Sequence, residues 1–355
     1  MAIKVLIVDD SPTMRALLRL MLERESDLDI VGAAANAQEA RGMIREMNPD
    51  VVTLDIEMPG MNGLEFLDKI MRLRPMPVII VSSLTREGTS TTVRALELGA
   101  VNCYAKPSGI ASDMVTADRG RLANLIREAA SVKVRGNAAI AQPVSAGQTA
   151  QVQASMALSS ARSSGSDAII AIGASTGGVE ALSNLLRRFP ADCPPTIIVQ
   201  HINGQFAPAM AARLDSLCAP SVVLADADLP IRRGHVYVAP GNDRHLSVRG
   251  LPGRLHCCLR AGDLISGHRP SIDAMFHSVA QVAGGRAVGI LLTGMGQDGA
   301  QGLLAMRKAG CRTIAQDQAS CVVYGMPRAA VEMGAADYVV NLSGIADKAL
   351  ELVAA

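Results

Sequence analysis

The sequence has no tryptophan and only four phenylalanines and four tyrosines among its 355 residues. Aliphatic side chains and methionine must therefore fill the cores, and a protein that works mainly by stacking its ligand on aromatic rings is excluded. An excess of one charge is also missing, because 34 Lys and Arg nearly balance 33 Asp and Glu. Without a basic surface or a block of like charge, a nucleic-acid partner is not expected.

Paired cysteines and long apolar runs are absent as well. The cysteines are odd in number and contain no Cys-x-x-Cys pair, which argues against a disulfide framework and against a zinc site. The first residues, Met1 to Val8, enter a strand pattern directly, without a leader-like segment. No apolar run approaches the roughly 18 residues that a membrane span needs. We expect a monomeric cytoplasmic protein that is not embedded in a membrane.

Short apolar runs alternate with longer segments of helical period in two series, which predicts two α/β domains with doubly wound parallel sheets. We expect the first domain at 1–128 and the second at 167–355, with an antiparallel pair of strands inserted in the second near His235 to Leu259. Residues 129–166 are rich in Ala, Gln, Ser and Gly without periodicity, and this composition predicts a flexible linker.

Polar side chains follow the apolar runs of the first series, where parallel strands would end. The carboxyl ends of such strands meet at one edge of the sheet, so these side chains should converge. Clustered carboxylates repel one another unless a hard cation such as Mg²⁺ binds among them, and a carboxylate beside Mg²⁺ and a lysine suits acyl-phosphate formation. The alternative is that Asp9-Asp10 only caps the N-terminus of a helix and that Asp55 is a solvated turn residue. This alternative does not explain why polar groups that suit one another follow all four strands. The residues are Asp9, Asp10, Asp55, Ser82, Ser83 and Lys106.

Three motifs in this series resemble two-component receiver domains. They are Val8-Asp9-Asp10-Ser11, the run from Asp55 through Glu57 to Gly63, and Lys106-Pro107. The resemblance implies a flavodoxin-like domain of five parallel strands, phosphorylated on Asp55 by a sensor histidine kinase. It further implies Mg²⁺ held by Asp9, Asp10, Asp55 and the Glu57 carbonyl, with Ser82 and Lys106 contacting the phosphoryl group. Cys103 stands where many receivers have an aromatic switch residue, so the signal relay is expected to differ.

The second series opens with an apolar run, the turn Gly173-Ala174-Ser175-Thr176-Gly177-Gly178 and a helical segment. This spacing suits a nucleophile elbow, in which small neighbours expose the Ser175 hydroxyl at the N-terminus of a helix. A glycine-rich dinucleotide turn is the rival interpretation. Such a cofactor site would need an acidic residue at the end of the next strand, but that strand ends in Gln200-His201. A later strand ends in a loop containing Asp298, so Ser175, His201 and Asp298 are candidates for nucleophile, base and orienting acid.

The second series also resembles the catalytic domain of the bacterial chemotaxis protein-glutamate methylesterases. The resemblance rests on Ala171–Gly178, Val199-Gln200-His201, His268-Arg269-Pro270-Ser271, Leu292–Gly299 and Gly325-Met326-Pro327. It implies a triad of Ser175, His201 and Asp298, with Thr176 beside the imidazole and the Met295 N–H in the oxyanion hole. His268 is expected in a loop that lines the cleft.

Together the two resemblances imply a phosphorylation-activated esterase. Its substrates would be glutamate methyl esters, and also glutamines, on methyl-accepting chemotaxis receptors. Mg²⁺ is expected at the receiver for phosphorylation, whereas the esterase step should need no cofactor. Two other classes remain open: an inactive esterase that serves as a phosphorylation-gated binding module, and a nicotinamide-dependent reductase.

Overall fold

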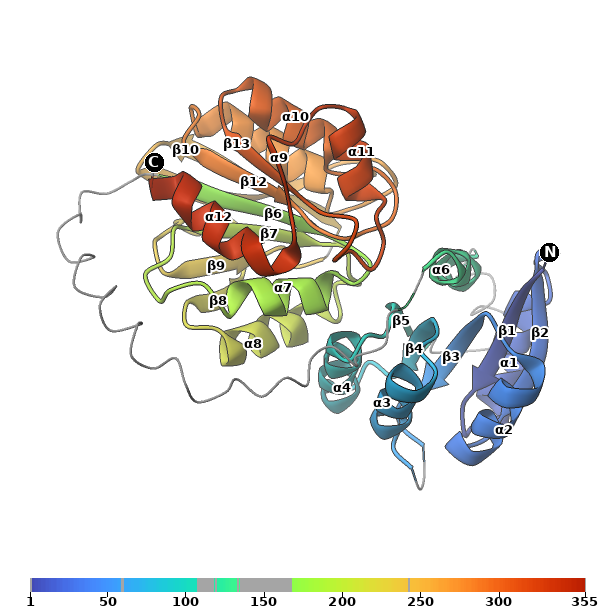
Figure 1. The fold of residues 1–355 in the computed structure, drawn as a ribbon. Coiled ribbons are helices and arrows are strands. Elements are labelled where there is room, and N and C mark those ends of the chain that lie inside the picture. The colour runs from blue at the N-terminus through green and yellow to red at the C-terminus, as the bar shows by residue number, and fades with distance from the viewer. Residues whose placement is uncertain are drawn as a thin grey trace, which may run out of the picture.

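The computed structural model describes residues 2–58, 61–106, 118, 120–132, 134, 168–241 and 243–354. The strands of this part form a five-stranded sheet, a seven-stranded sheet and one separate pair. Figure 1 shows that the two large sheets belong to two bodies, one blue to cyan and one green to red, which lie side by side. The predicted α/β class is confirmed for both.

The first sheet has the order β2-β1-β3-β4-β5, and its strands pair in parallel throughout. This is the predicted receiver-like sheet. Apolar side chains alternate between its faces: Val5 and Ile7 pack with α1 and α6, whereas Leu6 and Val8 pack with α2, α3 and α4. Such two-sided burial explains why the strands read as continuous apolar runs. The elements are β1 (Ile3–Val8), α1 (Pro12–Leu22), β2 (Leu28–Ala34), α2 (Ala37–Met47), β3 (Val51–Asp55), α3 (Gly63–Leu73), β4 (Val78–Ser82), α4 (Arg86–Glu97), β5 (Asn102–Ala105) and α6 (Arg121–Ala130).

The second sheet has the order β14-β13-β12-β6-β7-β9-β8, again with parallel pairing throughout. β10 and β11 form the predicted antiparallel insertion. The expectation placed the start of this insertion near His235, but that residue begins β9, which joins the parallel sheet. The strands are β6 (Ile169–Ala174), β7 (Thr196–Gln200), β8 (Ser221–Leu224), β9 (His235–Val238), β10 (Arg244–Leu251), β11 (Arg254–Ala261), β12 (Ala287–Leu291), β13 (Arg312–Gln316) and β14 (Tyr338–Val340).

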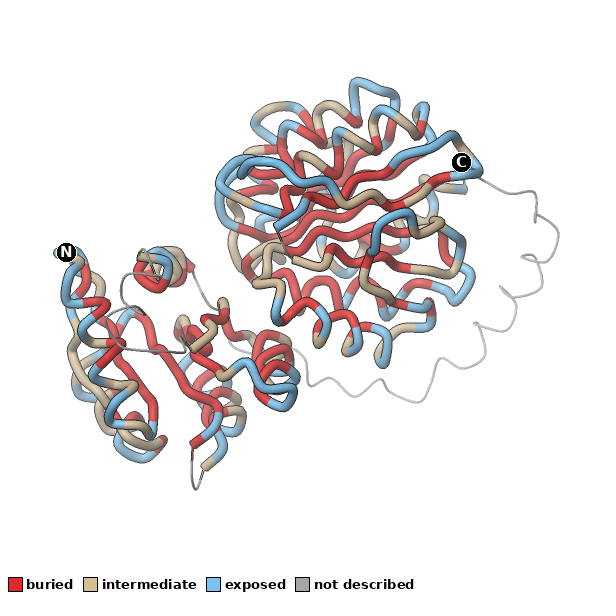
Figure 2. The backbone as a smooth tube through the Cα atoms, turned by 180° about the vertical axis from the view of Figure 1, so that it is seen from behind, coloured by how far each residue is buried: buried red, intermediate tan, exposed pale blue. Residues whose placement is uncertain are grey.

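Two helical layers cover the second sheet. Ile170 and Ile172 face a core formed with α7, α8 and α12, whereas Ile169 and Ala171 face α9, α10, α11 and the β10–β11 pair. Figure 2 shows the buried strands as a continuous red interior in both bodies. The helices are α7 (Gly178–Leu186), α8 (Ala207–Leu217), α9 (Ile272–Val282), α10 (Ala300–Lys308), α11 (Met326–Glu332) and α12 (Leu342–Ala354).

The two bodies are in contact through α4, which packs against α7 and α8. The Arg213 guanidinium on α8 donates to both carboxylate oxygens of Glu97 on α4, at 3.1 and 3.0 Å from Nε. The Ser183 hydroxyl on α7 adds a 3.3 Å hydrogen bond to the same carboxylate. Most of the predicted linker 129–166 lies outside the described residues, so the domain limits stay predictions. No helix in the described part is both long and apolar enough to cross a membrane.

Candidate active site

The turn after β6 presents Ser175 at the carboxyl edge of the second sheet. Its backbone is fixed from two neighbouring strand ends: the N–H donates to the Thr293 carbonyl at 3.0 Å, and the carbonyl accepts from Gln200 Nε2 at 2.8 Å. Gly177 adopts the left-handed φ of 76° that lets the chain turn into α7. A side chain on Gly178 would collide with Gln200, so the small residues of this turn are required by close packing.

The His201 side chain is bound to Asp298 across the strand ends. His201 directly follows β7, and its Nε2 lies 2.9 Å from Asp298 Oδ2, with side chains 8% and 0% exposed. An ionised carboxylate only accepts hydrogen bonds, so Nε2 carries the ring proton. The other nitrogen, Nδ1, has no hydrogen-bond partner among the described residues. His201 therefore presents a buried Nδ1 that no described residue occupies.

Asp298 sits on the N-terminus of α9. It accepts hydrogen bonds from the Ser271 hydroxyl at 2.8 Å and from the Ile272 and Asp273 N–H groups at 2.8 and 3.2 Å. Burial alone would raise the pKa of Asp298. The hydrogen bond and charge of His201 lower this pKa, and so do the hydrogen bonds from Ile272 and Ser271 at the helix end. The carboxylate thus stays ionised against the imidazole.

Sequence reasoning missed the residues that support Asp298. Ser271 caps α9 through its hydroxyl, which also accepts from the Ala274 N–H. Its own N–H donates to Nδ1 of His245, a buried histidine whose Nε2 contacts the Asp263 carbonyl at 2.8 Å. A Ser before an apolar helix is a capping signal that the sequence does offer. What the helix end binds depends on tertiary packing.

The other predicted cleft residues surround Ser175 and His201. Thr176 is buried, and its hydroxyl has no partner among the described residues. Met295 is 38% exposed and follows Gly294, where an added Cβ would lie 2.7 Å from Ser175 Cβ. The His268 ring stacks on the His201 ring, with centroids 3.8 Å apart. The structure therefore brings all of these residues to one edge of the sheet.

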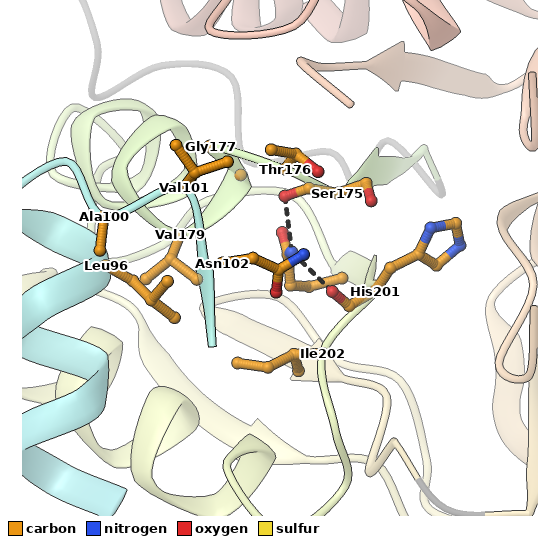
Figure 3. A pocket seen from close by; sticks show the side chains of 12 residues that line it. Leu96, Ala100, Val101, Asn102, Ser175, Thr176, Gly177, Val179, His201 and Ile202 are labelled. Carbon is orange, nitrogen blue, oxygen red and sulfur yellow. Dashed lines mark hydrogen bonds between the residues drawn. The ribbon is translucent and has the colours of Figure 1, made fainter. Parts of the chain in front are cut away.

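Residues of the first domain close over this edge. Leu96, Ala100, Val101 and Asn102, from the end of α4 and the start of β5, line one cavity together with Ser175, Thr176 and His201 (Figure 3). The cavity has a volume of about 20 Å³, which is about the space that one water molecule needs. In this arrangement residues of the first domain therefore lie against the Ser175 turn and leave little free space between them.

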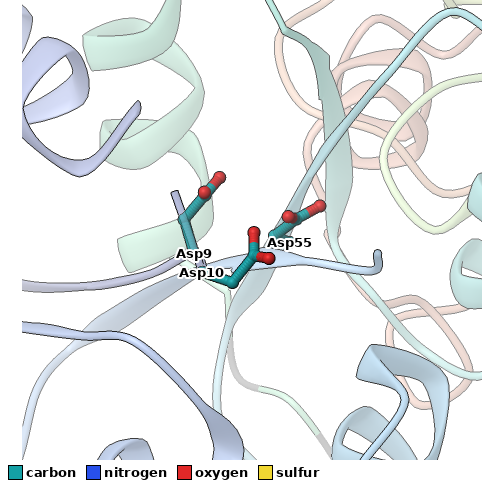
Figure 4. A group of neighbouring side chains, drawn as sticks. All are labelled: Asp9, Asp10 and Asp55. Atoms are coloured by element: carbon teal, nitrogen blue, oxygen red, sulfur yellow. The ribbon is translucent and has the colours of Figure 1, made fainter. Parts of the chain in front are cut away.

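A second candidate site lies at the carboxyl edge of the first sheet. The side chains of Asp9, Asp10 and Asp55 gather there (Figure 4), and each offers an oxygen within 4.8 Å of the others. Lys106 Nζ bridges Asp9 and Asp55 at 2.9 and 2.8 Å. Carboxylate oxygens, two of them from buried residues, are the donors that Mg²⁺ prefers, so the cluster fits this ion.

Charge and burial oppose each other at this site. Burial raises the pKa of Asp55, although the Lys106 hydrogen bond works against the shift. Burial alone would lower the pKa of Lys106, but hydrogen bonds to Asp55 and Asp9 outweigh it and raise that pKa. The Asp55 carboxylate also accepts the Glu57 N–H at 3.2 Å. A lysine kept charged beside a buried carboxylate suits an incoming phosphoryl group.

Ser82 ends β4, and Cys103 lies within the neighbouring strand β5. The Ser82 hydroxyl donates to the Ser83 and Gly88 carbonyls, both at 3.2 Å, and Gly88 belongs to α4. Cys103 is buried in the core shared with α4, and burial raises the pKa of its thiol to about 12. The Cys103 side chain therefore packs in the core and does not take the place of a rotating aromatic switch.

Comparisons with known proteins match both halves of the chain. The model of the CheB methylesterase family matches residues 170–349, and the model of the response regulator receiver domain matches residues 5–117. A protein of Caulobacter vibrioides, named protein-glutamate methylesterase/protein-glutamine glutaminase 1, is 51% identical over 99% of this chain and 98% of its own length. The chain belongs to the CheB methylesterase family.

Further relatives agree with this assignment to the CheB methylesterase family. The protein-glutamate methylesterase/protein-glutamine glutaminase of Agrobacterium fabrum is 49% identical over 99% of this chain and 97% of its own. Among solved structures, the CheB methylesterase catalytic domain of Thermotoga maritima aligns with a TM-score of 0.51 and 36% identity. It covers 52% of this chain, and 98% of that domain is matched. The predicted resemblance to CheB methylesterases with a receiver domain is confirmed.

Proposed function

We propose that this CheB-family chain is a phosphorylation-activated protein-glutamate methylesterase and protein-glutamine glutaminase. Its substrates are glutamate γ-methyl esters and glutamines of methyl-accepting chemotaxis receptors, and a single chain is the acting unit. The observation that carries the proposal is the hydrogen bond between His201 Nε2 and Asp298, which leaves Nδ1 without a partner among the described residues at the edge where Ser175 is presented. The relatives' printed names supply the substrate class.

Ser175, His201 and Asp298 have the chemistry of an acyl-transfer triad. The Ser175 oxygen attacks the γ-carbonyl carbon while His201 Nδ1 takes the hydroxyl proton, and Asp298 stabilises the imidazolium that results. The proton then passes to the leaving group, which departs as methanol from an ester or as ammonia from a glutamine. A water molecule, deprotonated by the same imidazole, releases the glutamate and restores Ser175. No cofactor takes part in these steps.

Backbone N–H groups next to Ser175 suit the developing oxyanion. Met295 directly follows Gly294, the residue that approaches the Ser175 side chain, and its N–H has no recorded acceptor among the described residues. Thr176 begins the turn into α7, where helix N–H groups and the positive end of the dipole lie. The Thr176 hydroxyl lines the cavity beside His201.

Asp55 is the proposed phosphoacceptor, with a sensor histidine kinase as donor. Mg²⁺ held by Asp9, Asp10, Asp55 and the Glu57 carbonyl would neutralise the phosphoryl oxygens when bound. The Lys106 ammonium supplies a second positive charge beside Asp55. The Ser82 hydroxyl is available to the phosphoryl group if it leaves the Gly88 carbonyl.

Closure of the esterase edge by the receiver supports control by occlusion. The cavity that receiver residues line together with Ser175 has a volume of about 20 Å³, which is about the space that one water molecule needs. The Ser82–Gly88 bond connects the phosphorylation site to the start of α4, and the Glu97–Arg213 pair connects its end to the esterase. A phosphoryl group that draws Ser82 away would bias α4 toward release of the cleft.

Methanol release from methylated receptor membranes tests the proposal. The full chain with a small phosphodonor should be active, and Ser175→Ala should be inactive under the same conditions. Demethylation that survives Ser175→Ala refutes the catalytic assignment, whereas lost activity with retained receptor binding separates an enzyme from a binding module. For the regulatory part, a fragment that starts near residue 163 should match the phosphorylated chain and exceed the unphosphorylated one. Equal rates for all three refute occlusion.

A further inference from the structure

The His268 ring lies flat on the His201 ring. The centroids are 3.8 Å apart and the planes differ by 8°, so the rings are stacked face to face. His268 thus covers one face of the imidazole whose Nε2 is bound to Asp298. A ring held only at one edge can still rotate about its side-chain bonds, and a parallel contact across its face restricts that rotation.

A tight turn holds His268 in place. Ile265 and His268 exchange two backbone hydrogen bonds, at 3.1 and 2.9 Å. The two residues between them, Ser266 and Gly267, have positive φ values of 52° and 81°. These are the features of a two-residue hairpin turn of type I′, which is among the most restricted short connections. The loop therefore presents His268 with a fixed backbone, although most of its neighbours are exposed.

His268 is uncharged at neutral pH. Burial, together with the charge of His201, lowers the pKa of His268 to about 4, although Asp298 opposes the shift. Glu128 on α6 of the receiver also interacts with the His201 imidazole. Burial raises the pKa of Glu128, and His201 acts to lower it. A neutral His268 ring can remain stacked on His201 without charge repulsion when His201 becomes protonated.

We propose that His268 is a positioning residue for the esterase reaction: its neutral ring is a stacking platform that fixes the His201 imidazole. The platform keeps Nε2 on Asp298 and Nδ1 on the Ser175 side, and its face receives the imidazolium that forms when Ser175 is deprotonated. His268 itself exchanges no proton with the substrate. The inference rests on the proposed triad, but it requires only an aromatic face at position 268.

Substitution of His268 in the full, phosphodonor-activated chain tests the proposal. Because a misplacement of about 1 Å can cost about a hundred-fold in rate, His268→Ala should lower kcat by about ten- to a hundred-fold and leave KM nearly unchanged. His268→Phe, which retains a ring without a titratable nitrogen, should recover most of this loss. His268→Asn, polar but not aromatic, should behave like His268→Ala. The assay is methanol release from methylated receptor membranes.

Each outcome separates the platform from other roles. Equal loss in His268→Phe and His268→Ala would overturn the proposal, because it would show that an imidazole nitrogen is needed. An unchanged kcat in His268→Ala would overturn it as well. His277→Phe, at an exposed position on α9, is the matched control and should be fully active. Urea unfolding of each variant separates misfolding from lost catalysis. Failure of the triad itself would appear separately, as activity in Ser175→Ala.

Discussion

Glu97 and Arg213 form an ion pair across the boundary between the receiver and the esterase. Arg213 contacts both carboxylate oxygens, and the Glu97 side chain is only 14% exposed. The pair lies at the end of α4, next to the residues that close the cavity at Ser175. It therefore joins the receiver to the esterase beside the cavity that Ser175 lines.

Glu97→Gln should loosen this arrangement and raise the activity of the unphosphorylated chain. A partly exposed pair of this kind contributes about 1 kcal/mol, which corresponds to roughly a five-fold shift toward the open form. Basal methanol release should rise by that order, while the phosphorylated rate stays constant. Arg249→Met breaks an exposed pair with Asp228 away from the boundary and is the control. A basal rate equal to that of the unsubstituted chain would contradict the role of Glu97.

Asp55→Asn should abolish stimulation by a small phosphodonor and leave basal activity in place. The amide cannot form the acyl-phosphate, yet it preserves the shape of the buried side chain. Removal of Mg²⁺ with a chelator should prevent stimulation of the unsubstituted chain in the same way. Asp68→Asn, on the exposed side of α3, should respond normally. Mass spectrometry of the intact chain measures phosphorylation, since there is no tryptophan to report it.

Asp298→Asn should lower kcat by about 10³- to 10⁴-fold, because the amide N–H₂ would favour the wrong imidazole tautomer. The substitution also removes a charge from the N-terminus of α9, so the urea midpoint should fall modestly. Asp192→Asn, at a position 86% exposed, should change neither quantity. Single-turnover methanol release measures the chemical step directly, and a near-normal rate would remove Asp298 from the triad.

Gly294→Ala should impair the nucleophile without altering its chemistry. The added Cβ would lie 2.7 Å from Ser175 Cβ and closer still to Met326 Sδ, so the Ser175 turn or the Met326 side chain must shift. A shift of this kind should lower kcat by about ten- to a hundred-fold. Gly42→Ala on α2, where an added Cβ meets nothing within 4 Å, is the control. Equal activity of both variants would show that the Ser175 turn tolerates displacement.

The stability of the esterase domain should decline as pH falls from about 6.5 toward about 4. His268 has a pKa of about 4 in the fold against an ordinary value of 6.5. Between these values the unfolded chain binds a proton that the folded chain does not, so the free energy of unfolding falls with decreasing pH. His268→Phe removes this contribution. The urea midpoint of the variant should therefore change less across this window, and identical profiles would contradict a depressed pKa.

Residues that directly follow the strands could be located from the sequence, because their position depends only on chain order. Parallel strands of an α/β domain end at one edge, so Ser175 and His201 were placed together from the residues that follow two apolar runs. Asp9, Asp55 and Lys106 were brought together by the same rule. Periodicity also predicted both sheets, because strands buried on two faces are apolar throughout.

Other features required the tertiary structure. Position in the sequence does not reveal which imidazole nitrogen faces Asp298, since side-chain rotation decides it. The Ser271 cap was readable, but its hydroxyl reaches Asp298 only because the α9 N-terminus packs at that strand end. His268 was expected in the cleft, whereas its stacking on His201 depends on a turn whose backbone only the fold fixes.

Two α/β domains, the strand ends that carry polar groups and the family can all be inferred from the residues alone. These depend on local periodicity and short motifs, which act over a few residues. The contact of α4 with the esterase, through a pair of residues 116 positions apart, is visible only in the fold. The physical reason is that such contacts depend on the complementary shape and charge of two separately folded surfaces, which no local pattern records.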